Sequence, residues 1–205
     1  MPSLCFRVSA ERAKITEVVE GLFICGITSL NAENIQNYQI SLIINATVEV
    51  PNARSLGNAH RLKLWLEDTP EADLYSHLDM LCDQIQEVLL QGGRVLVHCV
   101  AGVSRSSSIC LAFLVKYRDM SLRQAYMHMA HRRPLVSPNL GFWKQLILFE
   151  QGIRRTKGSV RIVRFNGQLL PDVYVSSEVN GKPAYRKSAF LPVLEPLAEV
   201  VQATA

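Results

Sequence analysis

The chain has 205 residues, a formal net charge of +4, 48% hydrophobic residues and 20% charged residues, which is typical of a globular protein of one domain with at most an appendage. Its five cysteines are odd in number and scattered, which argues against a disulfide framework and a zinc site and for a reducing compartment. No stretch approaches the roughly 20 apolar residues of a membrane span, and residues 1–14 lack the apolar core of a signal peptide. We therefore expect a soluble cytoplasmic protein, with the nucleus as the second candidate location.

The first half of the chain alternates between strand patterns and helix patterns. Four strands are predicted, at Leu22–Cys25, Leu42–Ala46, His60–Leu66 and Arg94–His98. The second is a nearly continuous apolar run, typical of a strand buried on both faces, whereas the third alternates apolar and polar residues. A short helix capped by Ser29 is expected after the first strand. Apolar residues from Leu74 to Leu89 then recur at helical spacing, and Gly92-Gly93 ends that helix.

The second half begins with a run of helices. Three are predicted, at Ile109–Tyr117, at Leu122–His131 and from Ser137 to about Gly152. Ser121 is expected to cap the second of these helices, and Ser137 the third, with Pro138 at its first helical position. Strands that alternate with helices indicate an α/β domain with a mainly parallel central sheet flanked by helices. We place this domain at residues 15–152.

Residues 153–175 have a different pattern and are predicted to form a basic, hairpin-like extension. Two strand-like runs flank Asn166-Gly167, which is a strong signal for a tight hairpin, and Pro171 confines the second arm to an edge or a bulge. The favoured interpretation is a solvated extension packed beside the domain. The alternative is a patch that recruits an acidic partner, a membrane or nucleic acid. Residues 176–205 contain three prolines and no clear periodicity, so we expect them to be largely disordered.

A candidate site lies between the fourth strand and the helix that follows it. The strand ends at Cys99, a loop of small residues follows, and Arg105 precedes the helix. Such a loop directs several backbone N–H groups and the helix dipole at one place, which suits an anion. These groups favour a thiolate at Cys99, and Arg105 can hold two oxygens of a phosphate. The alternative is a buried cysteine ahead of an ordinary helix.

The sequence His98-Cys99-x5-Arg105-Ser106 resembles the signature loop of the cysteine-based protein phosphatases. Its variant Ala101–Ser106 resembles the dual-specificity branch, among small atypical members without a kinase-docking domain. The resemblance implies the fold of these phosphatases, Cys99 as nucleophile and a Ser106 hydroxyl that eases departure of the sulfur. His98 would orient the loop and help to poise the thiolate, or is simply a buried histidine. The phosphate would be bound by Arg105 and by the backbone of Val100, Ala101, Gly102, Val103 and Ser104.

The displacement also needs a proton for the leaving oxygen, preferably from a carboxylic acid that faces the nucleophile. Asp68 follows the third strand, and the ends of parallel strands share one edge of a sheet. Its position relative to Cys99 is similar to that of the acid in the dual-specificity family. Glu67 and Glu71 are competitors, and Asp68 could instead only begin a turn before Pro70.

A second motif is the run Arg133-Pro134-x3-Pro138-Asn139-x-Gly141-Phe142. It resembles a family motif in which the asparagine, here Asn139, hydrogen-bonds the phosphate loop. The alternative for Asn139 is an ordinary polar residue in the first turn of a helix.

The predicted function is dephosphorylation of phosphotyrosine and of phosphoserine or phosphothreonine in proteins, through a phosphocysteine and without a metal or cofactor. Phosphorylated proteins, signalling kinases among them, are the expected partners, and no nucleic acid is expected. One alternative is a phosphatase for phosphoinositides or RNA 5′ phosphates, although Val100 and Val103 stand where loop lysines would favour a lipid headgroup. Another is a phosphoprotein-binding adaptor that uses the basic extension. Oxidation of Cys99, with Cys82 or Cys110 as a resolving thiol, is compatible with the enzyme.

Overall fold

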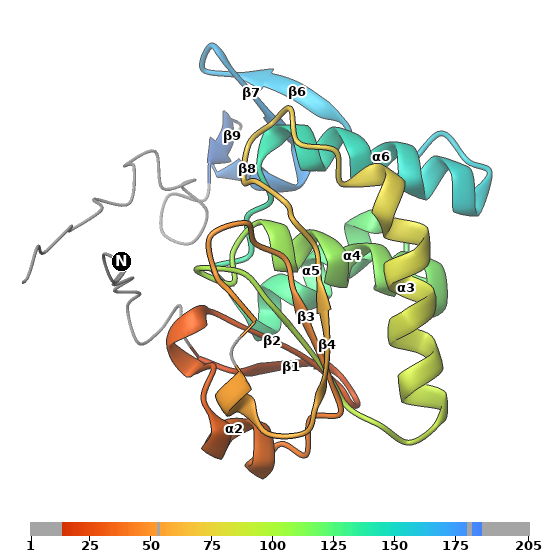
Figure 1. Ribbon diagram of the computed structural model, residues 1–205. Coiled ribbons are helices and arrows are strands. Elements are labelled where there is room, and N and C mark those ends of the chain that lie inside the picture. The colour runs from red at the N-terminus through yellow and green to blue at the C-terminus, as the bar shows by residue number, and fades with distance from the viewer. Residues whose placement is uncertain (1–13, 53, 180–181, 186–205) are drawn as a thin grey trace, which may run out of the picture.

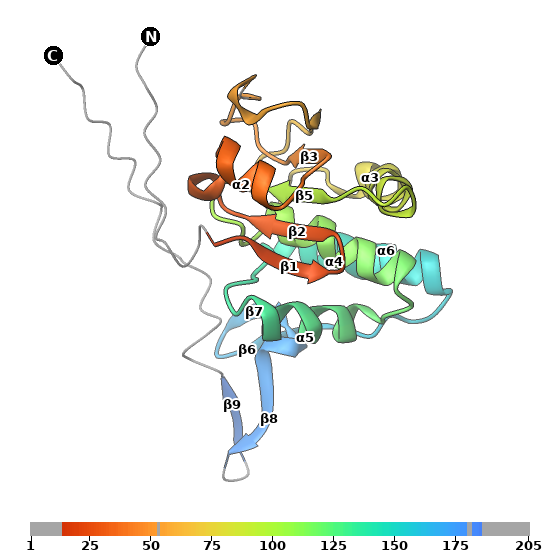
Figure 2. The same cartoon turned by 90° about the horizontal axis from the view of Figure 1, so that it is seen from below.

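The computed structural model describes residues 14–52, 54–179 and 182–185 (Figures 1 and 2). A five-stranded sheet with the order β1-β2-β5-β3-β4 forms its centre. The first strand is antiparallel to the second, and the other three pairings are parallel, which confirms the predicted, mainly parallel sheet. The strands are β1 (Thr16–Val19), β2 (Leu22–Cys25), β3 (Leu42–Asn45), β4 (His60–Lys63) and β5 (Val95–His98).

Helices cover both faces of this sheet. The short helix α2 lies on one face and the four long helices lie on the other (Figure 2). No helix in the described part of the chain is long and apolar enough to cross a bilayer. The helices are α2 (Ala32–Asn37), α3 (Tyr75–Leu90), α4 (Arg105–Tyr117), α5 (Leu122–Arg132) and α6 (Leu140–Arg154), with 3-10 turns at Ile27–Ser29, Arg54–Leu56 and Asp172–Tyr174.

The central strand β5 and the helix α4 carry the core. Side chains alternate along β5, so Val95 and Val97 face the long helices while Leu96 faces α2. Every residue of α4 from Arg105 to Val115 is buried. A buried strand that leads into a buried helix holds the loop between them, residues 99–104, firmly in place.

Several predicted element boundaries differ from the structure, and the predicted strand His60–Leu66 ends at Lys63. Helix α4 begins at Arg105 rather than Ile109, because the serines after Arg105 are buried within the helix. The first short helix is capped by Asn31, whose Oδ1 accepts from the Asn34 N–H at 2.8 Å, and not by Ser29. Helix α6 is capped by Asn139, whose Oδ1 accepts from the Phe142 N–H at 2.9 Å.

The C-terminal extension forms the predicted hairpin. Strands β6 (Ile162–Phe165) and β7 (Gln168–Pro171) pair antiparallel, and Asn166 and Gly167 have φ values of 47° and 81°, as a tight type I′ turn requires. Two further strands, β8 (Val175–Val179) and β9 (Lys182–Tyr185), also pair antiparallel. β9 and most of β8 lie within residues 176–205, for which we expect disorder, and residues 180–181 and 186–205 of that range lie outside the described residues.

Candidate active site

The Cys99 thiol lies at the bottom of the loop between β5 and α4. The residue is 1% exposed, and its Sγ accepts from the Gly102 N–H at 3.2 Å. The Ser106 Oγ, in the first turn of α4, is 3.1 Å from the same sulfur. Gly102 has a φ of 66°, which folds the loop back over the sulfur at little steric cost. Donors of this kind at a helix N-terminus stabilise negative charge on the sulfur.

The carbonyl groups of the loop point outward into the surrounding structure. In a trans peptide the N–H of the next residue points the opposite way, so these carbonyls turn the following N–H groups towards the inside of the loop. The result is a nest of backbone donors that suits an anion. Two backbone N–H groups donate to these carbonyls, Ile27 N to Val100 O and Ser137 N to Val103 O, both at 2.9 Å. The Arg133 side chain donates to the other two, from Nη2 to Ala101 O at 3.3 Å and from Nε to Gly102 O at 2.8 Å.

Arg133 braces this loop and was not assigned a role from the sequence, although it stands in the second motif. Its guanidinium is 3% exposed and also donates to Lys14 O at 2.7 Å and to Thr16 Oγ1 at 3.1 Å. Burial lowers the pKa of Arg133 below its ordinary value. The side chain therefore links the phosphate loop to the beginning of β1. Its place in the second motif was the only signal for it in the sequence.

The Arg105 side chain lies against the loop and is 4% exposed. Its Nη1 donates to Glu49 Oε2 at 2.7 Å and to Leu66 O at 3.1 Å. Its Nε is buried, lies 3.6 Å from Asp68 Oδ2 and has no hydrogen-bond partner among the described residues. A buried donor without a partner is uncommon, and here it offers one edge of the guanidinium to an oxyanion.

Glu49 is a second residue that sequence reasoning missed. Its carboxylate is one-third exposed and pairs with Arg105. Burial would raise the pKa of Glu49, but hydrogen bonds from Arg105 and from backbone N–H groups outweigh burial and hold that pKa below its ordinary value. Glu49 follows β3 at the same sheet edge as Asp68, so the rule that selected Asp68 could also have found it.

Asp68 lies beside the loop, as predicted, and is connected to it through two side chains. Its Oδ1 accepts from Ser104 Oγ at 2.6 Å and from Asn139 Nδ2 at 3.0 Å. The Asn139 backbone N–H also donates to Ser104 Oγ at 3.1 Å. Asn139 thus contacts the loop through its backbone and the acid through its amide. Glu67 and Glu71 are exposed, and neither makes a hydrogen bond or ion pair with the loop in the described part of the chain.

His98 is buried at the end of β5. Its Nδ1 lies 3.5 Å from the Cys99 carbonyl oxygen. Burial lowers the pKa of His98 to about 4, so the ring is neutral near pH 7. It can orient the loop, but it supplies no positive charge to poise a thiolate.

The other described cysteines are fully buried. Burial raises the pKa of Cys25 to about 12 and that of Cys82 and Cys110 above its ordinary value, so these thiols stay protonated near pH 7. Among the residues that the structure describes, no three His, Cys, Asp or Glu side chains come together as a metal site would need.

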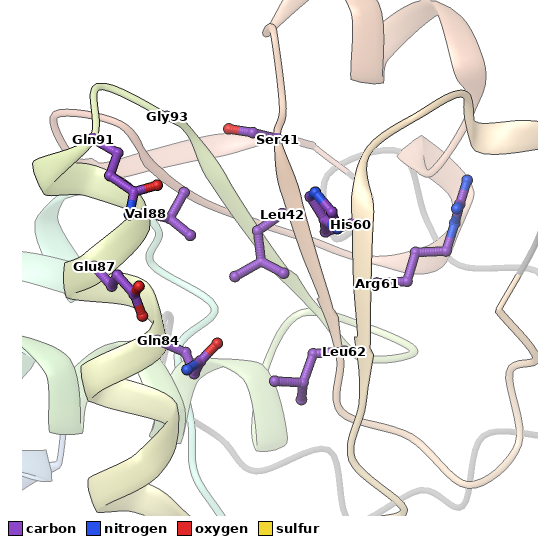
Figure 3. Close-up of a pocket in the computed structure, with 10 residues that line it drawn as sticks. All are labelled: Ser41, Leu42, His60, Arg61, Leu62, Gln84, Glu87, Val88, Gln91 and Gly93. Atoms are coloured by element: carbon purple, nitrogen blue, oxygen red, sulfur yellow. The ribbon is translucent and has the colours of Figure 1, made fainter.

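A separate groove of about 640 Å³ lies between β4 and α3 (Figure 3). Leu42, Leu62 and Val88 point towards one another across it, and Gln84 and Glu87 extend from α3. It lies where β3 and β4 begin, at the opposite end of the strands from Cys99. It is therefore not part of the phosphate-binding loop.

Comparisons with known proteins agree with this geometry. Residues 22–152 match the family model "Dual specificity phosphatase, catalytic domain". The chain is 39% identical over 162 residues to dual specificity protein phosphatase 14 of Mus musculus, covering 78% of this chain and 80% of that protein. The crystal structure of a mouse putative dual specificity phosphatase complexed with zinc tungstate is similar, with a TM-score of 0.66 and 32% identity over 69% of this chain and 89% of that one.

A further similar structure is that of human tyrosine phosphatase-like serine/threonine/tyrosine-interacting protein. Its TM-score is 0.62, with 30% identity over 69% of this chain and 98% of that chain. The family match spans both the loop and Asp68. The chain therefore belongs to the dual-specificity phosphatases of the protein tyrosine phosphatase superfamily, enzymes that hydrolyse the phosphate esters of tyrosine and of serine or threonine in proteins.

Proposed function

We propose that Cys99 is the nucleophile of this phosphatase and that Arg105 holds the phosphate. The observation that carries this proposal is the loop, whose four outward carbonyls leave N–H groups and the Arg105 Nε for an anion. A tetrahedral oxyanion of phosphate size is the expected occupant, bound by Ala101, Gly102, Val103, Ser104 and Arg105. Preorganised donors of this kind can each lower a barrier by about 3–4 kcal/mol.

In the first step the Cys99 sulfur attacks phosphorus, an S–P bond forms and the bond to the leaving oxygen breaks. Asp68 gives its proton to that oxygen. In the second step Asp68 takes a proton from water, the water oxygen attacks phosphorus and the S–P bond breaks. Ser106 Oγ, 3.1 Å from the sulfur, donates a hydrogen bond to the departing thiolate.

The most direct genetic test is Cys99→Ser. The variant should lose turnover of phosphopeptides, because a hydroxyl is a far weaker nucleophile than a thiolate. It should keep its affinity for tungstate, because the loop and Arg105 remain. Turnover by purified protein and oxyanion binding by calorimetry check the two halves. Residual activity near that of the wild type would contradict the mechanism, and a wild-type protein without activity that still binds phosphoproteins would favour the adaptor.

We further propose that residues 15–152 carry the catalysis and residues 153–175 support them. We place the enzyme in the cytoplasm and the nucleus, with signalling kinases among its substrates. Substrate trapping with Cys99→Ser or Asp68→Ala, followed by mass spectrometry of the retained phosphoproteins, tests the substrates. Recovery of no phosphoprotein above that retained by Arg105→Ala would contradict this assignment.

A further inference from the structure

The C-terminal extension contributes to a further groove on the protein surface. A groove of about 410 Å³ lies between α6 and the segment that leads into β6, and Figure 1 shows the hairpin beside this helix. Its volume falls within the range of roughly 300–1,000 Å³ that is common for ligand sites. Lys144, Ile147 and Leu148 line it from α6, and Lys157, Arg161 and Ile162 line it from the extension.

The charge of this groove is positive on both walls. Lys144, Lys157 and Arg161 are exposed, no carboxylate lines the groove, and these three cations form no ion pair with another described residue. The nearest acid on α6, Glu150, is 1% exposed. Its two oxygens already accept from the Leu122 N–H and the Ser159 N–H, each at 2.7 Å. Asp172 accepts from the Arg161 N–H at 3.2 Å, but it does not line the groove and pairs with Arg123 at 2.7 Å. No carboxylate of the groove lining therefore balances the three cations.

Apolar side chains lie between the cations. Leu148 is 55% exposed although it is a large hydrophobic residue, and Ile147 and Ile162 are half-buried. A ligand that covered these side chains would gain hydrophobic contact as well as ion pairs. The complementary chemistry is a peptide segment with carboxylates on either side of a leucine-like residue.

The groove is already formed in the free protein. Arg123 Nε donates to Ser159 O at 3.0 Å, and the Arg123 N–H donates to Ser159 Oγ at 2.9 Å. Gln151 Nε2 donates to Lys157 O at 3.0 Å, and this bond joins two residues that line the groove. Because these bonds fix the extension against α5 and α6, little ordering is needed on binding.

The position of the groove suits a docking site for the substrate. Ile147 lies eight residues along α6 from Asn139, which contacts Asp68, and this corresponds to about 12 Å of helix. We propose that the groove binds an acidic, leucine-containing segment of the same phosphoprotein that the active site dephosphorylates. The expected gain in catalysis rests on the proposed function, whereas binding of the segment to the groove does not.

The test uses the full chain and one defined probe. The probe is a fluorescent peptide in which glutamates surround two leucines, and its affinity is measured by fluorescence anisotropy. The groove variant is Lys144→Glu/Arg161→Glu, with one substitution on each wall. The matched control is Arg155→Glu/Arg164→Glu, which makes the same change in charge at exposed arginines of the α6 end and of β6 that do not line the groove.

A second measurement tests whether binding at the groove raises the rate of dephosphorylation. A phosphotyrosine peptide is compared with the same peptide joined to the acidic segment by a flexible Gly/Ser linker of about ten residues, long enough to span the distance. We expect the joined substrate to have a kcat/KM about tenfold higher, through a raised effective concentration. The groove variant should lose this advantage and bind the probe at least about tenfold more weakly, while its rate on the parent peptide stays unchanged.

The possible outcomes test binding at the groove and the proposed reaction separately. Equal loss of binding in the groove variant and the control would overturn the proposal in favour of general charge attraction, and so would binding to phosphatidylserine vesicles without binding to the peptide. Binding that depends on the groove without any turnover of the parent peptide would contradict the proposed function and leave the groove as a peptide-binding site. Wild-type protein that does not bind the probe overturns the inference itself.

Discussion

Arg105 presents two different edges of one guanidinium group. The Nη1 edge is held by Glu49 and by the Leu66 carbonyl, whereas the buried Nε has no hydrogen-bond partner among the described residues. Glu49 therefore holds the rotamer of Arg105, whose Nε lies 3.6 Å from Asp68 Oδ2 beside the loop. A carboxylate that touches no substrate can in this way control how the phosphate is held.

Replacement of Glu49 by Gln should weaken catalysis through Arg105. We expect kcat/KM to fall by about tenfold, because a misplaced guanidinium holds the phosphate poorly. Glu67→Gln, at an exposed carboxylate outside the site, is the control and should leave kcat/KM unchanged. Equal kinetics of Glu49→Gln and wild type would show that Glu49 does not position Arg105.

The same variant has a pH-dependent effect on stability. The folded-state pKa of Glu49 is lowered below 4.5, so its contribution is fully present above that value and is lost as the pH falls through the lower folded-state value. At pH 7 the free energy of unfolding of Glu49→Gln should be about 1–2 kcal/mol lower than that of the wild type. This figure is reduced because the Glu49 side chain is partly exposed. Urea unfolding at pH 7 and pH 3.5 should show this difference shrinking at the lower pH.

Residues whose role follows from neighbours in sequence were predictable, and residues that act across the fold were not. Cys99, Arg105 and Ser106 follow one another along the loop and the first turn of α4, and Asp68 lies in the segment after β4 at the same edge of the sheet. Arg133 reaches the loop carbonyls from the end of α5, which no rule of sheet order predicts. Glu49 pairs with Arg105 from the segment after β3, where the rule that selected Asp68 could have found it. The charge of His98 also depends on burial, which the sequence did not reveal.

Helix α6 and the acid loop are packed closely at Gly141. A Cβ on Gly141 would lie 1.9 Å from the Pro70 carbonyl oxygen and 2.5 Å from its Cα, and real Cβ atoms do not approach so closely. Glycine at this position therefore lets the segment Asp68–Pro70 lie on the first turn of α6, where Asn139 holds the acid.

Gly141→Ala should therefore displace the acid loop. We expect a loss of about 1–3 kcal/mol in the free energy of unfolding and a fall in kcat that is larger for phosphoserine than for phosphotyrosine, since the poorer leaving group depends more on the acid. Gly152→Ala is the matched control on the same helix, because its nearest neighbour would be 3.9 Å away. If both variants behave alike, the close approach at Gly141 does not position Asp68.

The elements themselves were predicted best where local chemistry specifies them. Ser121 caps α5 as expected, with a capping box completed by Gln124, and Asn166-Gly167 makes the predicted turn. The cap of α6 is Asn139 and not the predicted Ser137, because the Asn139 side chain also donates to Asp68. This is a tertiary contact. The four buried residues at the beginning of α4 were missed because three of them are serines, which are usually exposed.

At the scale of the whole molecule, the extension is part of the core. Val160 is 1% exposed, Leu170 8% and Tyr174 5%. The Tyr174 hydroxyl accepts from Trp143 Nε1 at 2.9 Å. Truncation near Gly152 would therefore uncover α5 and α6, so point substitutions are the better way to separate the extension from catalysis.

Tyr174→Phe should destabilise the protein without altering its chemistry. Loss of the hydroxyl leaves the buried Trp143 N–H without its acceptor, at a cost of about 1–3 kcal/mol. Tyr75→Phe, at a side chain that is 46% exposed, should change stability by less than about 0.5 kcal/mol. Thermal unfolding and the rate on a small aryl phosphate measure both effects. Unchanged stability of Tyr174→Phe would mean that the extension is not anchored through this bond.

The phosphocysteine is the central claim, and trapping it tests that claim most directly. Wild-type protein and Cys99→Ser are mixed with a phosphotyrosine peptide, quenched in acid within milliseconds and digested for mass spectrometry. The account predicts a phosphate on the peptide that contains Cys99 in the wild type, and none in Cys99→Ser. Turnover without any phosphorylated cysteine, or phosphate on a different residue, would contradict it.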